Sequence, residues 1–464
     1  MIPSCLSFAS LLRSLRALAV ILALLPGVSL WAQEPAGEQG YVLPPITDAD
    51  KILLPADFNQ VDFYLVTVDV GNQVWDNFGH TALRVVDRNS NSDLVFNWGL
   101  FDPSGGYVRF AVNFLRGILP YQLGVSPPAW EFGRYEREQR SVWQDKLNLS
   151  NAQKETLYKR LAWNLREENI VYDYQYFFDN CTTRVRDYLN EALGGRLQAQ
   201  NRAPSQNTFR DEVLSHYASV PLVALSLDVL MNGNIDRRMS QWEQMFLPAQ
   251  LRRELLSFPS DVTRNGQRID MLEEPTVIME FTPPVAGPNP YYLLLAGLLL
   301  PVLLLLLMFR RTSLASFSSQ PGITLRNPAL SYRVMGLLGV LISLCSGIYG
   351  LIMSFGWLAS AHLDLHHNLN LLLFWPSDLL GLGYGVRWLL SGRACPVSAG
   401  WRSLLIFYLL AHILAALAYL LMGLTGMGGQ EVGSLLLFVL PGLLGFAIVV
   451  WNTGFQAVRR IRFS

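Results

Sequence analysis

Cys181 and its neighbours have the pattern of a reactive thiol at the start of a helix. Asn180 is a good N-cap, and Gly194 and Gly195 form a stop signal, so we predict that Cys181 occupies the first turn of a helix. The N–H groups and the positive dipole end of such a helix favour thiolate over thiol, and they can stabilise an oxyanion. We therefore predict Cys181 as a nucleophile, activated in part by Asn180. The alternative is a buried, inert cysteine.

A cysteine nucleophile needs a base, and residues 33–290 contain only two histidines, His80 and His216. His80 begins a predicted strand, where its side chain can face a cleft. His216 ends a charged helical stretch, which is typical of a solvated residue near a helix C-terminus. We predict His80 as the base. Taken alone, it would also fit a histidine that is hydrogen-bonded at a sheet edge.

The base must itself be oriented by a third polar group. Asn97 lies within an apolar run on the next predicted strand, where a buried amide requires a hydrogen-bond partner, and a neighbouring imidazole would provide one. Asn97 is therefore the predicted orienting residue. The alternatives are an asparagine bonded only to backbone, or orientation of the base by Asp76 or Asp93.

Several other side chains could assist such chemistry. Arg184, one helical turn after Cys181, can lower the pKa of the thiol or pair with Asp187. Arg84 can bind a phosphate or carboxylate. Aromatic side chains could line a substrate groove, although they more commonly belong to a core; they are Trp98, Phe101, Tyr107, Phe110, Phe114 and Tyr121.

The chain begins with the pattern of a secretory signal. Arg13 and Arg16 precede an apolar stretch at 17–30, and we predict cleavage after Ala32. Cys5 lies before the apolar stretch and would leave with the signal. The region that follows would then be exported.

Five apolar segments of near-spanning length lie in the second half of the chain, at 291–309, 334–354, 369–390, 403–424 and 433–453. The predicted outer loops contain no Lys or Arg, whereas ten arginines fall in the predicted inner loops and tail, namely Arg310, Arg311, Arg326, Arg333, Arg387, Arg393, Arg402, Arg459, Arg460 and Arg462. The positive-inside rule thus predicts a cytoplasmic C-terminus and an exported N-terminal region. Cys345 would lie in the second span and Cys395 would face the cytoplasm. Cys181 would be the only exported thiol, without a disulfide partner.

The predicted organisation is therefore a signal (1–32), a linker (33–60), a catalytic domain (61–260), a juxtamembrane linker (261–290) and a membrane domain (291–464). Within the catalytic domain, strands are expected at 62–70, 79–86, 93–100 and 141–147, the first three as antiparallel neighbours. A helix is expected at 151–167, with Ser150 and Gln153 forming a capping box. The fold class is α+β followed by an all-α bundle of five transmembrane helices.

Composition excludes some functions. The formal net charge is zero, without a basic stripe, which argues against a nucleic-acid partner. We predict no cofactor and no metal, because His362 and His366 have the spacing of metal ligands but only Asp364 as an acidic neighbour. His412, within the fourth segment, is expected to make a polar contact between helices or to belong to a pathway.

Two motifs carry a family resemblance. Residues 78–85 (FGHTALRV) and 179–187 (DNCTTRVRD) together resemble the extracytoplasmic domain of the Lnb-type lipoprotein intramolecular transacylases. The likeness extends over about 61–256, including 242–248 (WEQMFLP), and 368–372 (NLNLL) resembles a further family element. The order of histidine strand and cysteine helix also resembles the circularly permuted papain-like, or NlpC-like, folds of the lecithin:retinol acyltransferase group.

The resemblance implies an acyl thioester on Cys181, formed from a glycerol-linked fatty ester and transferred to the amine of a lipoprotein N-terminus, or to water. Substrates would be a phospholipid or a lipoprotein, at the inner membrane of a bacterium with the catalytic domain periplasmic. Two alternatives stay open: an amidase or peptidase of cell-wall peptides using the same dyad, and a non-catalytic membrane scaffold or transporter accessory protein. The oligomeric state is not predicted.

Overall fold

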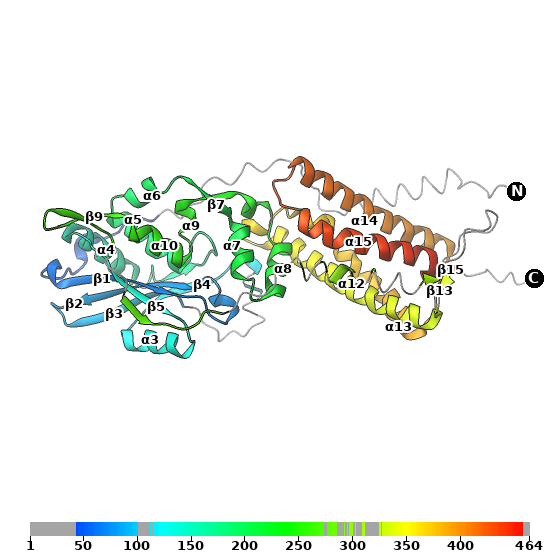
Figure 1. The fold of residues 1–464 in the computed structure, drawn as a ribbon, viewed down its shortest axis with the longest axis horizontal. Helices are drawn as coiled ribbons and strands as arrows, with labels where there is room; N and C mark the ends of the chain where they lie inside the picture. The colour runs from blue at the N-terminus through cyan, green and yellow to red at the C-terminus, as the bar shows by residue number, and fades with distance from the viewer. Residues whose placement is uncertain are drawn as a thin grey trace, which may run out of the picture.

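The structure is a computed structural model, and it describes residues 43–100, 109, 112–113, 115–272, 276–284, 292, 295, 297–299, 302, 309–310, 324–325 and 327–457. Its two parts lie end to end, a sheet part (residues 43–284) and a helical part (residues 327–457) (Figure 1). The predicted signal and most of the first predicted span fall outside the described residues.

A seven-stranded antiparallel sheet organises the sheet part, in the order β11-β5-β1-β2-β3-β4-β6. The strands are β1 (Val61–Val68), β2 (His80–Asp87), β3 (Ser92–Leu100), β4 (Pro120–Ser126), β5 (Val142–Lys146), β6 (Val171–Asp173) and β11 (Thr276–Met279). β1, β2 and β3 are antiparallel neighbours, which confirms the strands predicted at 62–70, 79–86 and 93–100. The short polar turn between β2 and β3 fixes their register, with Ala82 opposite Asn97.

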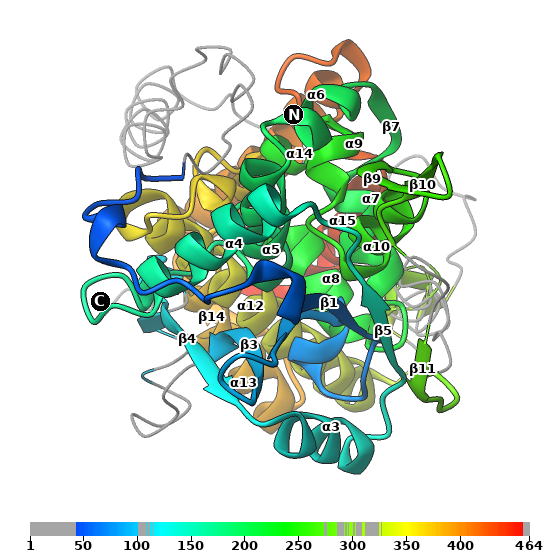
Figure 2. The same ribbon diagram turned by 90° about the vertical axis from the view of Figure 1, so that its left-hand side faces the viewer.

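Helices cover both faces of this sheet. α4 (Asn151–Asn164), α5 (Cys181–Ala192) and α10 (Pro248–Leu256) pack on one face, and α3 (Pro128–Arg137) lies on the other (Figure 2). Alternation along the strands separates the two cores: Leu83 of β2 faces α5, whereas Ala82 faces α3. His80 and Asn97 share the α3 face by the same alternation.

Three elements form a corner beside the helical part, namely α7 (Phe209–His216), α8 (Pro221–Leu230) and η5 (Gly233–Asp236) (Figure 1). The other elements of the sheet part are α6 (Arg196–Gln200), β7 (Pro204–Thr208), β8 (Arg238–Ser240), α9 (Gln241–Gln244), β9 (Pro259–Arg264) and β10 (Gln267–Asp270), of which the β9–β10 pair lies toward the end away from the helical part. The helical part contains α12 (Pro328–Ala359), α13 (Gly381–Ser391), α14 (Ala399–Thr425) and α15 (Gly433–Val449).

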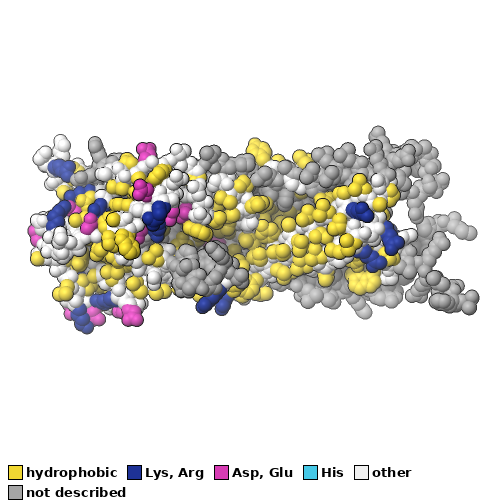
Figure 3. All heavy atoms as spheres, turned by 90° about the horizontal axis from the view of Figure 1, so that it is seen from below, with side chains coloured by type: hydrophobic (Ala, Val, Ile, Leu, Met, Phe, Trp, Pro, Cys, Tyr) yellow, Lys and Arg dark blue, Asp and Glu magenta, His cyan; other side chains and the backbone are white. Residues whose placement is uncertain are grey.

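Among the described residues, α12 and α14 are long and apolar enough to cross a membrane. Hydrophobic side chains cover much of the face of the helical part in Figure 3, and Lys and Arg side chains gather toward its far end. That end holds the start of α12 and the end of α13, because Gly392 lies against Ala329. The arginine distribution is the one expected for inner loops.

The prediction of one continuous helix over 369–390 is wrong. The chain forms short 3-10 turns at Leu369–Leu372 and Pro376–Leu380 before α13, whose 11 residues span only about 16 Å. Pro376 interrupts helical hydrogen bonding, and the polar side chains of this segment bind neighbouring elements instead. One of them, Asp378, pairs with His412 of α14, with Nε2 and Oδ1 3.1 Å apart. His412 therefore makes the predicted polar contact between helices.

Candidate active site

Helix α5 begins at Cys181, and Asn180 is its N-cap, as predicted. The Asn180 Oδ1 atom accepts hydrogen bonds of 2.8 Å from the backbone N–H groups of Thr182 and Thr183. Its Nδ2 group donates to two backbone carbonyls, one in α9's C-terminal turn. Because the whole carboxamide is engaged in holding the helix start, we assign Asn180 as a residue that positions the thiol and not as an oxyanion donor.

The Cys181 thiol lies between α5 and the start of β2. The backbone N–H groups of Thr81 and Thr182 donate to the sulfur, and the Thr182 hydroxyl oxygen lies 3.8 Å from Sγ. Burial raises the pKa of the thiol above its ordinary value, and these hydrogen bonds oppose that rise without cancelling it. Burial therefore opposes the effect that was predicted for the helix start, and the balance favours the neutral thiol.

His80 is held by Asn97, with Nε2 and Oδ1 2.7 Å apart. Asn97 Nδ2 donates to Glu131 Oε2 at 2.9 Å, so its oxygen must face the imidazole. This network assigns the proton to Nε2 and leaves Nδ1 unprotonated and able to accept a proton. Burial, with the charges of Arg140 and Arg134, lowers the pKa of His80 to about 3, so the imidazole is neutral at pH 7.

Glu131 of α3 is a member of this network that the sequence did not reveal. It is 8% exposed and accepts hydrogen bonds from Asn97 Nδ2, Ser126 Oγ (2.7 Å) and Arg134 (2.9 Å). It thereby fixes the orientation of the Asn97 amide. The sequence places Glu131 only in the first turn of an amphipathic helix, and that position does not indicate a contact with β3.

Gly99, near the end of β3, lies close to both Cys181 and His80. A Cβ atom placed on Gly99 would be 3.9 Å from both Cys181 Cβ and His80 Cε1, and the φ angle of +96° favours glycine. No hydrogen bond joins these two described side chains, and catalytic contacts are commonly long before substrate binds. Both side chains are partly accessible to solvent. A side chain at residue 99 would therefore contact both residues.

The other predicted site residues are engaged elsewhere. The Arg184 guanidinium pairs with Asp179 (2.6 Å between Nη2 and Oδ2) and lies over the Tyr172 ring, so pairing with Asp187 is not its main contact. Arg84 is bound by Asp93, at 2.6 and 2.8 Å, and by Gln144. These contacts neutralise both arginines, so neither is retained as an activating or substrate-binding residue.

The aromatic predictions have mixed outcomes. Trp98 is fully buried and its Nε1 donates to Asn164 at 2.9 Å, so it belongs to the core and not to a groove. Phe101 lies outside the described residues. Tyr121 does lie near the thiol, stacked on Tyr174 with ring centroids 4.5 Å apart. Burial, with a contribution from Cys181, raises the pKa of Tyr121 to about 12.

The alternative orienting residues do not contact His80. Asp76 pairs with Arg140 at 2.9 Å, and Asp93 pairs with Arg84. His216, the rejected base, ends α7 as expected and stacks on Phe78. In the described part of the chain, no group of three or more His, Cys, Asp or Glu side chains is placed to hold a metal ion.

Comparison with known families gives one match. Residues 50–214 match the family described as the Lnb N-terminal periplasmic domain. This region of the chain is therefore similar to the Lnb N-terminal periplasmic domain. The match includes β1 to β3, α3 and α5, and therefore His80, Asn97, Glu131 and Cys181. No curated protein and no solved structure matches the chain. The family description and the two long apolar helices together indicate a membrane protein with a periplasmic N-terminal domain.

The protonation state of Cys181 at rest should be visible in the pH dependence of thiol alkylation. Because the pKa of Cys181 is raised and that of His80 is lowered, the pair should be neutral at pH 7 and not a thiolate–imidazolium pair. The rate of iodoacetamide alkylation should therefore rise through a midpoint above about pH 9. The alkylation rate would be measured at each pH by quenching the reaction of the full-length protein at set times and quantifying the Cys181 peptide by mass spectrometry. A plateau already reached by pH 7 would show a resting thiolate and contradict this account.

Glu131 should be needed for catalysis without touching substrate. In Glu131→Gln an amide replaces the carboxylate, and its own NH2 group can compete for the Asn97 oxygen and release His80. We expect the turnover rate to fall about 10- to 100-fold with little change in KM, by analogy with other residues that orient a ligand or base. Glu138→Gln, on the turn after α3, is the matched control. Equal activity in both variants would exclude the role assigned to Glu131.

Proposed function

We propose that the protein is a membrane-tethered thiol acyltransferase in which Cys181 is the nucleophile, His80 the base and Asn97 the residue that orients the base. The observation that carries the proposal is the hydrogen bond between His80 Nε2 and Asn97, which leaves Nδ1 to act as the base, in a histidine that flanks Gly99 together with Cys181 in a region similar to the Lnb N-terminal domain. A histidine held in this tautomer is suited to accept a proton from a thiol.

In the first half-reaction, Nδ1 of His80 takes the thiol proton as Cys181 Sγ attacks the ester carbonyl carbon. The resulting tetrahedral oxyanion collapses, the carbon–oxygen bond of the ester breaks, and the imidazolium returns the proton to the departing alcohol. The product on the enzyme is an acyl thioester. Since the resting thiol is neutral, proton transfer and attack must be concerted or nearly so.

In the second half-reaction, an amine attacks the thioester and His80 accepts its proton. Cleavage of the carbon–sulfur bond yields an amide, and the proton returns to the Cys181 thiolate. Water in place of the amine would give a free fatty acid. The Lnb-type match favours the amine of a lipoprotein N-terminus as acceptor and a glycerol-linked acyl ester as donor.

A lipid substrate fits the position of the site. Phe78 and Asn77, just before His80, contact the corner between α7 and α8, and α8 packs on α12, a candidate spanning helix. We further propose a circularly permuted papain-like fold, since the histidine strand precedes the cysteine helix that packs on it. An inner-membrane protein with several spans and a cytoplasmic C-terminus accords with the arginine distribution.

The proposal is tested by supplying purified full-length protein with a diacyl phospholipid carrying one isotopically labelled chain, together with a synthetic diacylated lipopeptide that has a free N-terminal amine. The labelled acyl group should appear as an amide on the lipopeptide. Release only as fatty acid would indicate a hydrolase. No acyl release, combined with cleavage of a peptidoglycan peptide, would replace the proposal with an amidase.

A further inference from the structure

The sheet part and the helical part share one apolar core. Val229 of α8 is buried with Met353 of α12, Tyr419 of α14 and Leu435 of α15. Helix α8 is therefore not simply a buried helix of the sheet part, because it completes the bundle. A chain linker alone would leave the sheet part free to turn on the membrane, whereas this packing joins the two parts directly.

Two carboxamides of the helical part cap the end of α8. Asn368 Nδ2 donates to the carbonyl oxygens of Val229 (3.0 Å) and Leu230 (2.7 Å). Asn370 Nδ2 donates to the carbonyl of Val229 (2.8 Å). The last carbonyls of a helix have no intrahelical partner, so these bonds satisfy groups that would otherwise be buried and unpaired. We call the Asn368 and Asn370 side chains the latch.

The latch is itself held rigidly. Asn368 and Asn370 are 3% and 0% exposed. The Asn370 oxygen accepts from the Tyr419 hydroxyl at 2.6 Å, and the Asn368 oxygen accepts from Gln430 Nε2 at 3.1 Å. The two amide oxygens are thus held by α14 and the loop after it, which orients both Nδ2 groups toward the carbonyls of α8.

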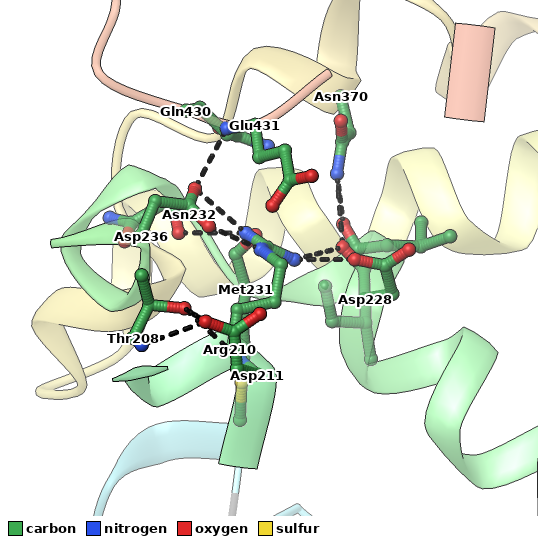
Figure 4. Close-up of polar contacts among 12 residues, drawn as sticks. Thr208, Arg210, Asp211, Asp228, Met231, Asn232, Asp236, Asn370, Gln430 and Glu431 are labelled. Carbon is green, nitrogen blue, oxygen red and sulfur yellow. Dashed lines mark hydrogen bonds and ion pairs between the residues drawn. The ribbon is translucent and has the colours of Figure 1, made fainter. Parts of the chain in front are cut away.

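Arg210 at the start of α7 extends this connection (Figure 4). It is 2% exposed, pairs with Asp228 of α8 at 2.6 Å, and pairs with Asp236, whose carboxylate also accepts the backbone N–H of Glu431 at 2.9 Å. Three elements of the corner and a loop of the helical part therefore meet at one buried guanidinium. Breaking any of these bonds would leave a buried charge or carbonyl unpaired.

The opposite end of α7 reaches the candidate active site. His216 stacks on Phe78 with ring centroids 4.7 Å apart, and Phe78 lies two residues before His80. A separate contact joins the two parts elsewhere, where the Ala361 N–H donates to the Arg116 carbonyl at 2.8 Å. Two contacts at different places prevent rotation about either one.

We propose that Asn368 and Asn370 are positioning residues, which hold the sheet part in one orientation so that the Cys181 thiol faces acyl esters at the membrane surface. This inference rests on the proposed function, and it gives the helical part a role beyond anchoring. Substrate in a bilayer cannot reorient freely to meet the thiol, so a small misplacement of the domain costs a large factor in rate. A soluble reagent has no such constraint.

The test compares the wild-type protein with Asn368→Ala/Asn370→Ala, and with Asn370→Asp, which keeps the size of the side chain but cannot donate to Val229. Asn327→Ala is the matched control. Asn327 is an exposed residue that caps the N-terminal end of α12, whereas the latch lies beyond the C-terminal end of that helix. All are placed in phosphatidylethanolamine and phosphatidylglycerol nanodiscs. Three quantities are measured: acyl-thioester formation from these lipids, alkylation of Cys181 by iodoacetamide, and deuterium uptake at the Ala361 amide.

The latch variants should lose thioester formation by about 10- to 100-fold, alkylate within twofold of wild type, and exchange the Ala361 amide faster. Asn327→Ala should match wild type in all three. Undiminished thioester formation in the double variant would overturn the inference. A parallel loss of alkylation would also overturn it, because the latch would then only maintain the fold of the site. If the wild type forms no thioester, the proposed function fails, while amide exchange still tests the latch.

Discussion

Replacing Cys181 with serine should reduce acyl transfer by about 10⁴-fold or more. Serine can occupy the first position of α5, because Asn180 caps the helix through backbone N–H groups of the next two residues and not through the thiol. The loss would come from the nucleophile alone. With a pKa of about 3, the His80 imidazole is a weak base, and a serine hydroxyl is far harder to ionise than a thiol.

The measurement is the initial rate of label transfer from phospholipid to lipopeptide. Cys345→Ser is the matched control, since Cys345 is an exposed thiol on α12, and it should retain full activity. If Cys181→Ser is expressed normally and still transfers the labelled acyl group, the thiol mechanism is excluded.

Replacing His80 with alanine should lower the transfer rate by about 10²- to 10⁴-fold, the usual contribution of a general base. The residual rate should rise with pH, because hydroxide can generate the thiolate that His80 would otherwise produce. Alkylation of Cys181 above pH 10 should remain close to that of wild type. This pattern separates loss of the base from loss of the fold.

The control for His80→Ala is His367→Ala, a histidine that packs against Trp357 in the helical part. Its transfer rate should be unchanged. If His80→Ala kept the wild-type rate at pH 7, or if its alkylation failed at every pH, His80 could not be the base of an otherwise intact site.

The elements that carry Cys181 and His80 were predictable because their signals are local. An N-cap before a helical stripe and a glycine stop define α5, and the short polar turn at 87–92 sets β2 beside β3. The contact between His80 and Asn97 follows from that register together with the need to satisfy a buried amide.

Contacts that depend on packing between distant segments were not predictable. Glu131 reaches Asn97 only because α3 packs on the far face of the sheet, and Arg84 meets Gln144 only because β5 joins the same sheet. The same limit explains the thiol pKa. A helix start favours the thiolate locally, but desolvation of the thiol by burial opposes it more strongly, and that burial is a property of the whole fold.

Helix breaks in the segment 369–390 also depended on tertiary partners. Its hydropathy is that of a spanning helix, but Asn368, Asn370 and Asp378 each bind another element and hold the chain in short turns. A hydropathy average over the segment includes these residues but carries no information about the side chains that they contact.

The central claim is that Cys181 forms an acyl thioester with a lipid-derived chain. Full-length protein would be incubated in phospholipid nanodiscs without an amine acceptor, denatured in acid and digested. The mass of the Cys181 peptide would then be measured by mass spectrometry. The account predicts a mass increase of one fatty acyl group on Cys181 that neutral hydroxylamine removes and that Cys181→Ser lacks. Only unmodified Cys181 peptide, from protein that still transfers label to the lipopeptide, would contradict it.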